Sequence, residues 1–203
     1  MSIYPEIIMS STYSNIEEIA KKENEHLWDF TRKRLDGWKH HINRINHPKH
    51  KILDNTFSAI IDRMKENSIK MFVETKSIYT GVEASFEDAG LWDAKRDIAY
   101  LKRIYDYGYK CHGLELDGAF FDYTNAGMTD EQAGKAVVDY FRTVNEAYPD
   151  TLLYLLFNFP NWGWKGKGAY RTDNGDPMYM GDAYNTFIFL SDLLKKNNIP
   201  IEG

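Results

Sequence analysis

The sequence is poor in cysteine, in clustered basic residues and in long apolar runs, and each of these absences argues against a class of protein. It has one cysteine, Cys111, so no disulfide can form within the chain. It has no long run of Lys and Arg and a formal net charge of -5, which argues against a nucleic-acid partner. No segment is apolar enough to span a membrane, and residues 1–6 lack the basic start of a signal peptide. We therefore expect a soluble, cytoplasmic protein that binds neither nucleic acid nor membrane.

The composition is that of a globular protein with one sizeable core, since 43% of the residues are hydrophobic and 27% are charged. Aromatic residues reach 15%, including 14 Tyr and 5 Trp. Many of them fall in polar loops, which favours a surface that stacks on a ligand.

Helical and strand patterns alternate along the chain. After a short apolar run at 7–9, strands are expected at 69–78, 109–121 and 151–159, and helices at 57–64, 91–104, 133–144 and 183–196. Thr129 and Gln132 are spaced as a capping box. Residues 16–45 are expected to be mostly helical, although 37–45 fits neither period, so a helix and a strand both stay open there. Residues 160–181 are expected to form a loop rich in Gly, Trp and Tyr.

Strands separated by single helices indicate parallel pairing with right-handed crossovers, and hence an α/β fold. A doubly wound sheet and a TIM-type (β/α) barrel both satisfy this pattern. The first strand lacks a glycine-rich phosphate turn, and polar residues and long loops follow several strands, which favours the barrel. A complete barrel needs about 250 residues, so we expect a partial barrel of five or six βα units. We expect residues 1–203 to form a single barrel-like domain, an N-terminal fragment of a longer barrel. Pairing with another chain, or a missing C-terminal region, would then cover the open edge.

The acidic segment 111–122 is the first candidate site. Glu115 and Asp117 would point to the same face of a strand, and close, buried carboxylates shift one another's pKa, as general acid/base work requires. Two positions on one strand lie only about 6.6 Å apart, on the same side of a substrate. Glu74 is therefore the best candidate for an opposing carboxylate. The alternatives are an ion pair between Glu74 and Lys76, and a polar barrel layer in which Lys76 or an arginine neutralises the two acids.

Further candidates for substrate binding follow the same rule, because ligands bind beyond the carboxyl ends of parallel strands. They are Lys76, Tyr79, Asp122, Asn158, Asn161, Trp162 and Trp164. Rings beside amides in 158–171 suit the flat faces and hydroxyl rims of sugars, and aromatics that only fold over the barrel rim would give the same pattern.

With its strand order, GLELDG at 113–118 and NFPNWGW at 158–164, the chain resembles the barrel-type glycoside hydrolases. The resemblance implies a carboxylate at the end of the fourth strand as acid/base, here Glu115 with Asp117 as its neighbour, and a nucleophile on a later strand. It also implies a carbohydrate ligand and no cofactor. Many such families carry Asn-Glu at that strand end, where this sequence has Leu114 before Glu115.

Two other functions stay open. Glu115 and Asp117 could bind a divalent cation in a phosphodiesterase, although the His-Arg-Gly motif of the glycerophosphodiester type is absent and no metal site is expected. His40, His41, His47 and His50 are expected to be exposed polar residues. A carbohydrate-binding module without turnover is the third possibility.

Overall fold

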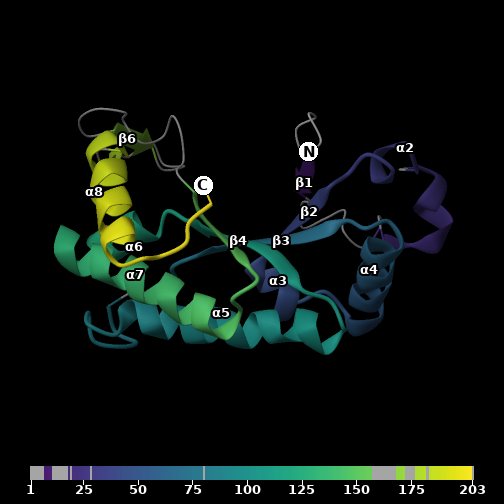
Figure 1. Ribbon diagram of the computed structural model, residues 1–203, viewed down its shortest axis with the longest axis horizontal. Coiled ribbons are helices and arrows are strands. Elements are labelled where there is room, and N and C mark those ends of the chain that lie inside the picture. The colour runs from purple at the N-terminus through teal and green to yellow at the C-terminus, as the bar shows by residue number, and fades with distance from the viewer. Residues whose placement is uncertain are drawn as a thin grey trace. The chain divides into compact units, whose positions relative to one another are not determined.

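The computed structural model describes residues 7–10, 18, 20–27, 29–79, 81–156, 168–171, 177–181 and 183–202 (Figure 1). The strands are β1 (Ile8–Ser10), β2 (Gly37–His41), β3 (Lys70–Lys76), β4 (Cys111–Asp117), β5 (Leu152–Leu156), β6 (Gly168–Arg171) and β7 (Pro177–Gly181). The helices are η1 (Lys22–Leu27), α2 (Asp29–Arg32), α3 (Ile42–Asn46), α4 (Asp54–Glu66), α5 (Ala89–Asp106), α6 (Ala119–Asn125), α7 (Asp130–Ala147) and α8 (Ala183–Lys196).

Five strands form one parallel sheet in the order β1-β2-β3-β4-β5. A doubly wound sheet reverses its strand order at a switch point, whereas a barrel adds each new strand on the same side, as here. After α8, Ile201 makes a parallel bridge with Leu153 of β5, and the Glu202 amide donates to the Leu153 carbonyl at 2.9 Å. The prediction of an α/β fold of partial barrel type is confirmed.

The structure resolves one alternative that the sequence left open and corrects two local predictions. Residues 37–41 form the strand β2, and the helix α3 follows from residue 42. The strand expected at 109–121 ends at Asp117, because Gly118 adopts a left-handed φ of 60° and starts α6. The prediction of a loop over 160–181 is wrong in part, since β6 and β7 pair as an antiparallel hairpin.

The chain divides into two compact units, and the prediction of a single domain stays a prediction. Unit 1 comprises Met1–Thr75 and Asp97–Leu114, and unit 2 comprises Lys76–Arg96 and Glu115–Gly203. Among the described residues, no helix has both the length and the apolar character needed to cross a membrane.

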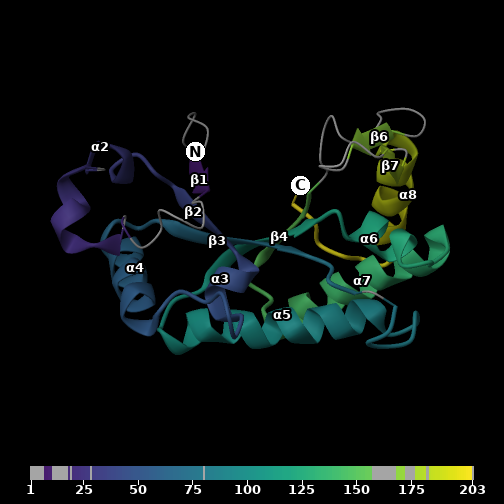
Figure 2. The same cartoon turned by 180° about the vertical axis from the view of Figure 1, so that it is seen from behind.

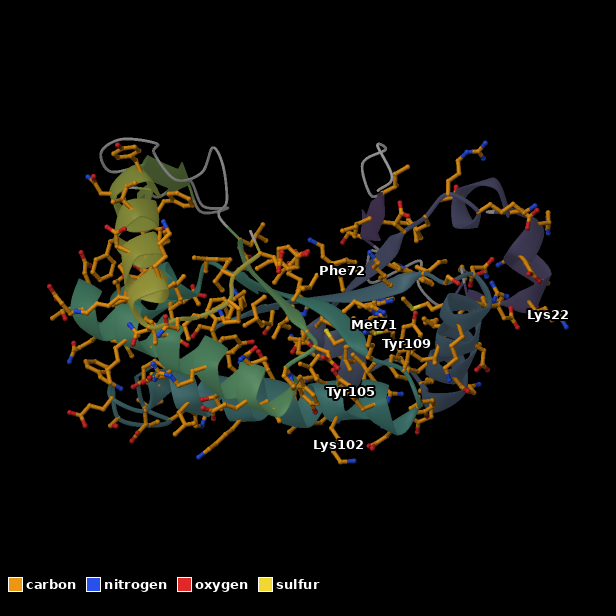
Figure 3. All side chains as sticks on the ribbon, viewed as in Figure 1. Lys22, Met71, Phe72, Lys102, Tyr105 and Tyr109 are labelled. Carbon is orange, nitrogen blue, oxygen red and sulfur yellow. The ribbon has the colours of Figure 1, made fainter. Side chains whose placement is uncertain are left out.

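Unit 1 is built on the strands β1 to β3. Phe72, marked on β3 in Figure 3, lies across Gly37 of β2 so closely that a Cβ atom there would be 2.6 Å from the ring. The amide of Met71 donates to Nδ1 of His112 at 3.1 Å, and the hydroxyl of Tyr109 donates to the Ile69 carbonyl. These bonds join the starts of β3 and β4.

A buried arginine holds the helices of unit 1 together. The Arg103 guanidinium donates to the carbonyls of Ile45 and Ile52 and to the Asp54 carboxylate, the last at 2.6 Å. It also lies over the Phe57 ring, 4.2 Å from its centroid. Its charge is therefore satisfied without water, which lets it lie in the core.

His40 is buried, with 1% of its surface exposed, so the expectation that it would be an exposed polar residue is wrong. It stacks at a tilt on Trp38, with 4.8 Å between the ring centroids. Burial, with the nearby Arg44 charge, lowers the pKa of His40 from 6.5 to about 3. The imidazole is neutral in the folded state at physiological pH.

The first prediction concerns stability in acid. The unfolded chain binds a proton at His40 below about pH 6.5 while the folded chain does not, so acidification favours unfolding. From this residue we expect a loss of about 2 kcal/mol between pH 7 and pH 5, measured by urea unfolding and absent in His40→Asn. His50→Gln, at an exposed position, is the control. An NMR titration midpoint for His40 near 6.5 in the folded protein would contradict the prediction.

Unit 2 packs α6, α7 and α8 side by side (Figure 2). The capping box predicted at the start of α7 is confirmed, with the Thr129 amide donating to Gln132 Oε1 at 2.9 Å and the Gln132 amide to Thr129 Oγ1 at 3.3 Å. Gly90 of α5 lies against α7, where a Cβ atom would be 1.9 Å from the Ala136 carbonyl oxygen. Gly90 thus allows the two helices to approach closely.

The second prediction follows from this contact. Gly→Ala inside a helix ordinarily stabilises it by about 1 kcal/mol, but Gly90→Ala must push two backbones apart. We expect a net destabilisation of about 1–3 kcal/mol in chemical unfolding. Lys95→Ala, an exposed position on the same helix, should change stability little. An unchanged or raised midpoint for Gly90→Ala would show that the helices separate without cost.

Candidate functional site

The acidic end of β4 belongs to unit 2. Leu114 and Leu116 of β4 are fully buried, whereas Glu115 and Asp117, on the alternate face, are half-buried. The two carboxylates therefore share one face of the strand and keep contact with solvent.

Asp122 joins these acids because of the turn at Gly118. The left-handed Gly118 ends β4, and its carbonyl accepts the amides of Phe121 at 3.0 Å and Asp122 at 3.1 Å. This tight turn starts α6 and places Asp122 in the first helical turn, close enough to Asp117 for the two charges to interact.

The environment of Asp122 favours its protonated form. Burial is the largest cause, the carboxylates of Asp117 and Asp93 act in the same direction, and the Lys76 ammonium opposes them. Together they raise the pKa of Asp122 from 3.8 to about 6. A carboxyl group of this kind can donate a proton near neutral pH.

From the sequence, Asp122 was predicted only to contact the substrate. The feature of the sequence that could have indicated more is the glycine directly after Asp117, because a glycine there can end the strand and bring the two acids together.

Beneath the end of β3 lies a fully buried carboxylate, Asp93 of α5. Its oxygens accept from Ser77 Oγ at 2.7 Å, from the Tyr123 hydroxyl at 2.9 Å and from the Arg96 guanidinium at 2.9 Å. The Ile78 amide adds a longer bond of 3.4 Å. These donors come from the loop after β3, from α5 itself and from α6, so Asp93 holds three segments together.

The other ligand-binding candidates of unit 2 differ in exposure. Lys76 is exposed, and its carbonyl accepts from the Arg96 guanidinium at 3.0 Å. Tyr79 is buried, with its hydroxyl donating to the Ala84 carbonyl at 2.7 Å and its ring edge-on to Tyr123. It holds the loop after β3 in place, and its role in binding stays a prediction.

Glu74 lies in unit 1 and forms an ion pair with Lys39 of β2, at 2.9 Å, rather than with Lys76. Its Cα partner in the parallel register is His41. The Lys39 charge compensates a carboxylate that would otherwise be costly to half-bury. The role of Glu74 as an opposing carboxylate stays a prediction.

Asn158, Asn161, Trp162 and Trp164 lie outside the described residues. The last described residue before them, Leu156, accepts a hydrogen bond from the Gly118 amide at 3.3 Å. Leu156, at the end of β5, therefore lies next to the acidic end of β4.

Among the residues that the structure describes, no group of three or more His, Cys, Asp and Glu side chains is arranged to hold a metal ion. Within this described part of the chain, Glu115 and Asp117 therefore belong to no such group, and the geometry does not add support for the phosphodiesterase hypothesis.

No protein-family model and no curated protein matches the sequence. Solved structures do resemble it. The α-galactosidase TtGalA from Thermus thermophilus, in complex with stachyose, is 13% identical with a TM-score of 0.47, covering 76% of this chain and 40% of its own. An α-amylase from Lactobacillus plantarum is 15% identical with a TM-score of 0.44, and the match covers 74% of this chain and 44% of the α-amylase chain. The glycoside hydrolase domain of PelA from Pseudomonas aeruginosa is 13% identical with a TM-score of 0.45, covering 96% and 81%.

This chain thus spans less than half the length of the first two enzymes. All three are glycoside hydrolases.

The third prediction uses the raised pKa of Asp122. The folded chain holds the Asp122 proton up to about pH 6 and the unfolded chain only to about pH 4, so stability falls as pH rises through this window. Asp122→Asn should therefore stabilise the protein at pH 8, by about 1–2 kcal/mol after allowing for partial exposure, and leave it unchanged at pH 3. Thermal unfolding at the two pH values measures this. Asp150→Asn, an exposed position, is the control, and equal stability of wild type and Asp122→Asn at pH 8 would refute the raised pKa.

Proposed function

We propose that the carboxyl end of β4 in unit 2 hydrolyses a glycosidic bond, with Asp122 as the general acid and Asp117 as the carboxyl group beside it. In this reaction Asp122 donates its proton to the oxygen of the leaving sugar while a carboxylate stabilises the positive charge that develops on the ring. The oxygen of a water molecule then bonds to the anomeric carbon, and the proton of that water returns to Asp122. Glu115, on the same face of β4 as Asp117, is the second candidate for that carboxylate.

The single observation that carries this proposal is geometric: the turn at Gly118 places the half-buried Asp122 beside Asp117, where burial and neighbouring charge raise its pKa to about 6. A carboxyl group that holds its proton near neutral pH beside a second carboxyl group is what acid-assisted glycosidic cleavage needs. A carboxylate pair serving only as an exposed, solvated surface would not be expected to hold a proton near neutral pH.

A carbohydrate substrate is supported by the segment after Leu156. Its sequence sets Trp162 and Trp164 among glycines and the amides of Asn158 and Asn161, a composition that suits sugar rings. The hydrogen bond from the Gly118 amide to the Leu156 carbonyl places the end of β5 beside the carboxyl end of β4.

The fourth prediction concerns activity and its pH dependence. Asp122→Asn should lower kcat on a cleavable oligosaccharide by about 100-fold or more while binding is retained, because only proton transfer is lost. In the wild type, kcat should fall above about pH 6, as Asp122 loses its proton. Lys76→Met removes the charge that opposes protonation, so the fall should move to higher pH. Reducing-end assays over an oligosaccharide panel measure these effects, with Lys95→Met as the matched control.

Three outcomes would count against the proposal. Unchanged turnover in Asp122→Asn would exclude Asp122 as the acid. Oligosaccharide binding without turnover, in the wild type as in Asp122→Asn, would point to a binding module. Loss of activity on a phosphodiester after chelation would point to the metal-dependent alternative.

A further inference from the structure

The buried carboxylate of Asp93 lies outside the face that would meet a substrate. It belongs to α5, has no exposed surface, and accepts from Ser77, Tyr123 and Arg96 at 2.7 to 2.9 Å. A buried charge of this kind is costly unless every lone pair is used, and four donors are directed at it.

Its donors lie next to the residues that would do the chemistry. Tyr123 follows Asp122 in α6, and Ser77 follows Lys76 at the end of β3. Arg96 joins the two sides, since it pairs with Asp93 through one nitrogen and donates to the Lys76 carbonyl through the other, at 3.0 Å. The backbones that carry the acid and its neighbouring lysine are therefore anchored to one carboxylate.

We propose that Asp93 is a positioning residue for Asp122, holding α6 through Tyr123 and keeping the proton on Asp122 through its own buried negative charge. This inference deepens the proposed function and rests on it for the role of Asp122 as the acid. Among the described residues, the charged groups that act on Asp122 are Lys76, Asp117 and Asp93, and of these three Asp93 is the fully buried one. Asp93 thus holds Asp122 in position and favours its protonated form without itself lying on the binding surface.

The test is a titration of the Asp122 carboxyl carbon by NMR in protein labelled with ¹³C-aspartate, with the signal assigned from its loss in Asp122→Asn. Asp93→Asn keeps the size of the side chain and removes its charge, so the Asp122 midpoint should fall by about 0.5 pH units or more. Arg96→Met leaves the Asp93 charge uncompensated, so the midpoint should rise. Asp97→Asn is the matched control: Asp97 lies on the same helix, is equally buried and accepts from Thr75 at 2.7 Å, and its loss should leave the Asp122 midpoint unchanged.

The opposite shifts of the Asp122 midpoint expected in Asp93→Asn and Arg96→Met distinguish an effect of the Asp93 charge from a loss of packing around Asp122. Loosening would expose Asp122 to water in both variants and lower the midpoint in both, which would overturn the proposal, as would an unchanged midpoint in Asp93→Asn. If Asp93→Asn does not fold, a rise in Arg96→Met supports the proposal and a fall or no change refutes it. The titration needs no turnover, so opposite shifts in a protein that hydrolyses no oligosaccharide would refute the proposed function and leave the role of Asp93 standing.

Discussion

The buried carboxylate of Asp93 is the constraint on which the candidate site depends. Its charge can lie at zero exposure only because the loop after β3, α5 and α6 each direct donors at it. Because a carboxylate accepts hydrogen bonds from limited directions, those donors must keep fixed places. The loop after β3 and the helix α6 are therefore held in place by one buried interaction.

The site in unit 2 uses three acids and one lysine in unequal environments. Asp93 is buried and fully bonded, Asp117 is half-buried on β4, and Asp122 carries the raised pKa that follows from its burial and its two acidic neighbours. Lys76 limits that rise. Differences in burial and charge thus give chemically identical side chains separate roles, which is how carboxylate enzymes obtain an acid and a base from one residue type.

In unit 1, two charged side chains that are withdrawn from water have charged partners among the described residues. Glu74 is neutralised by Lys39 on the neighbouring strand, and Arg103 by Asp54 and two carbonyls. His40 avoids the cost differently, since burial depresses its pKa and the ring stays neutral. These groups serve the structure of unit 1. The side chain best suited to proton transfer, Asp122, lies in unit 2.

The sequence alone determined the alternation of α4, β3, α5, β4, α7 and β5, the parallel sheet, the capping box at Thr129 and the shared face of Glu115 and Asp117, because periodicity and capping involve residues close in the chain. It did not reveal the partner of Glu74, the burial of His40, or the neighbours that raise the pKa of Asp122. Those depend on segments far apart in sequence, Lys39 beside Glu74 and Asp93 near Asp122, that meet only in the folded chain. Desolvation and charge interactions act through space, so only the tertiary structure decided which carboxyl group holds a proton.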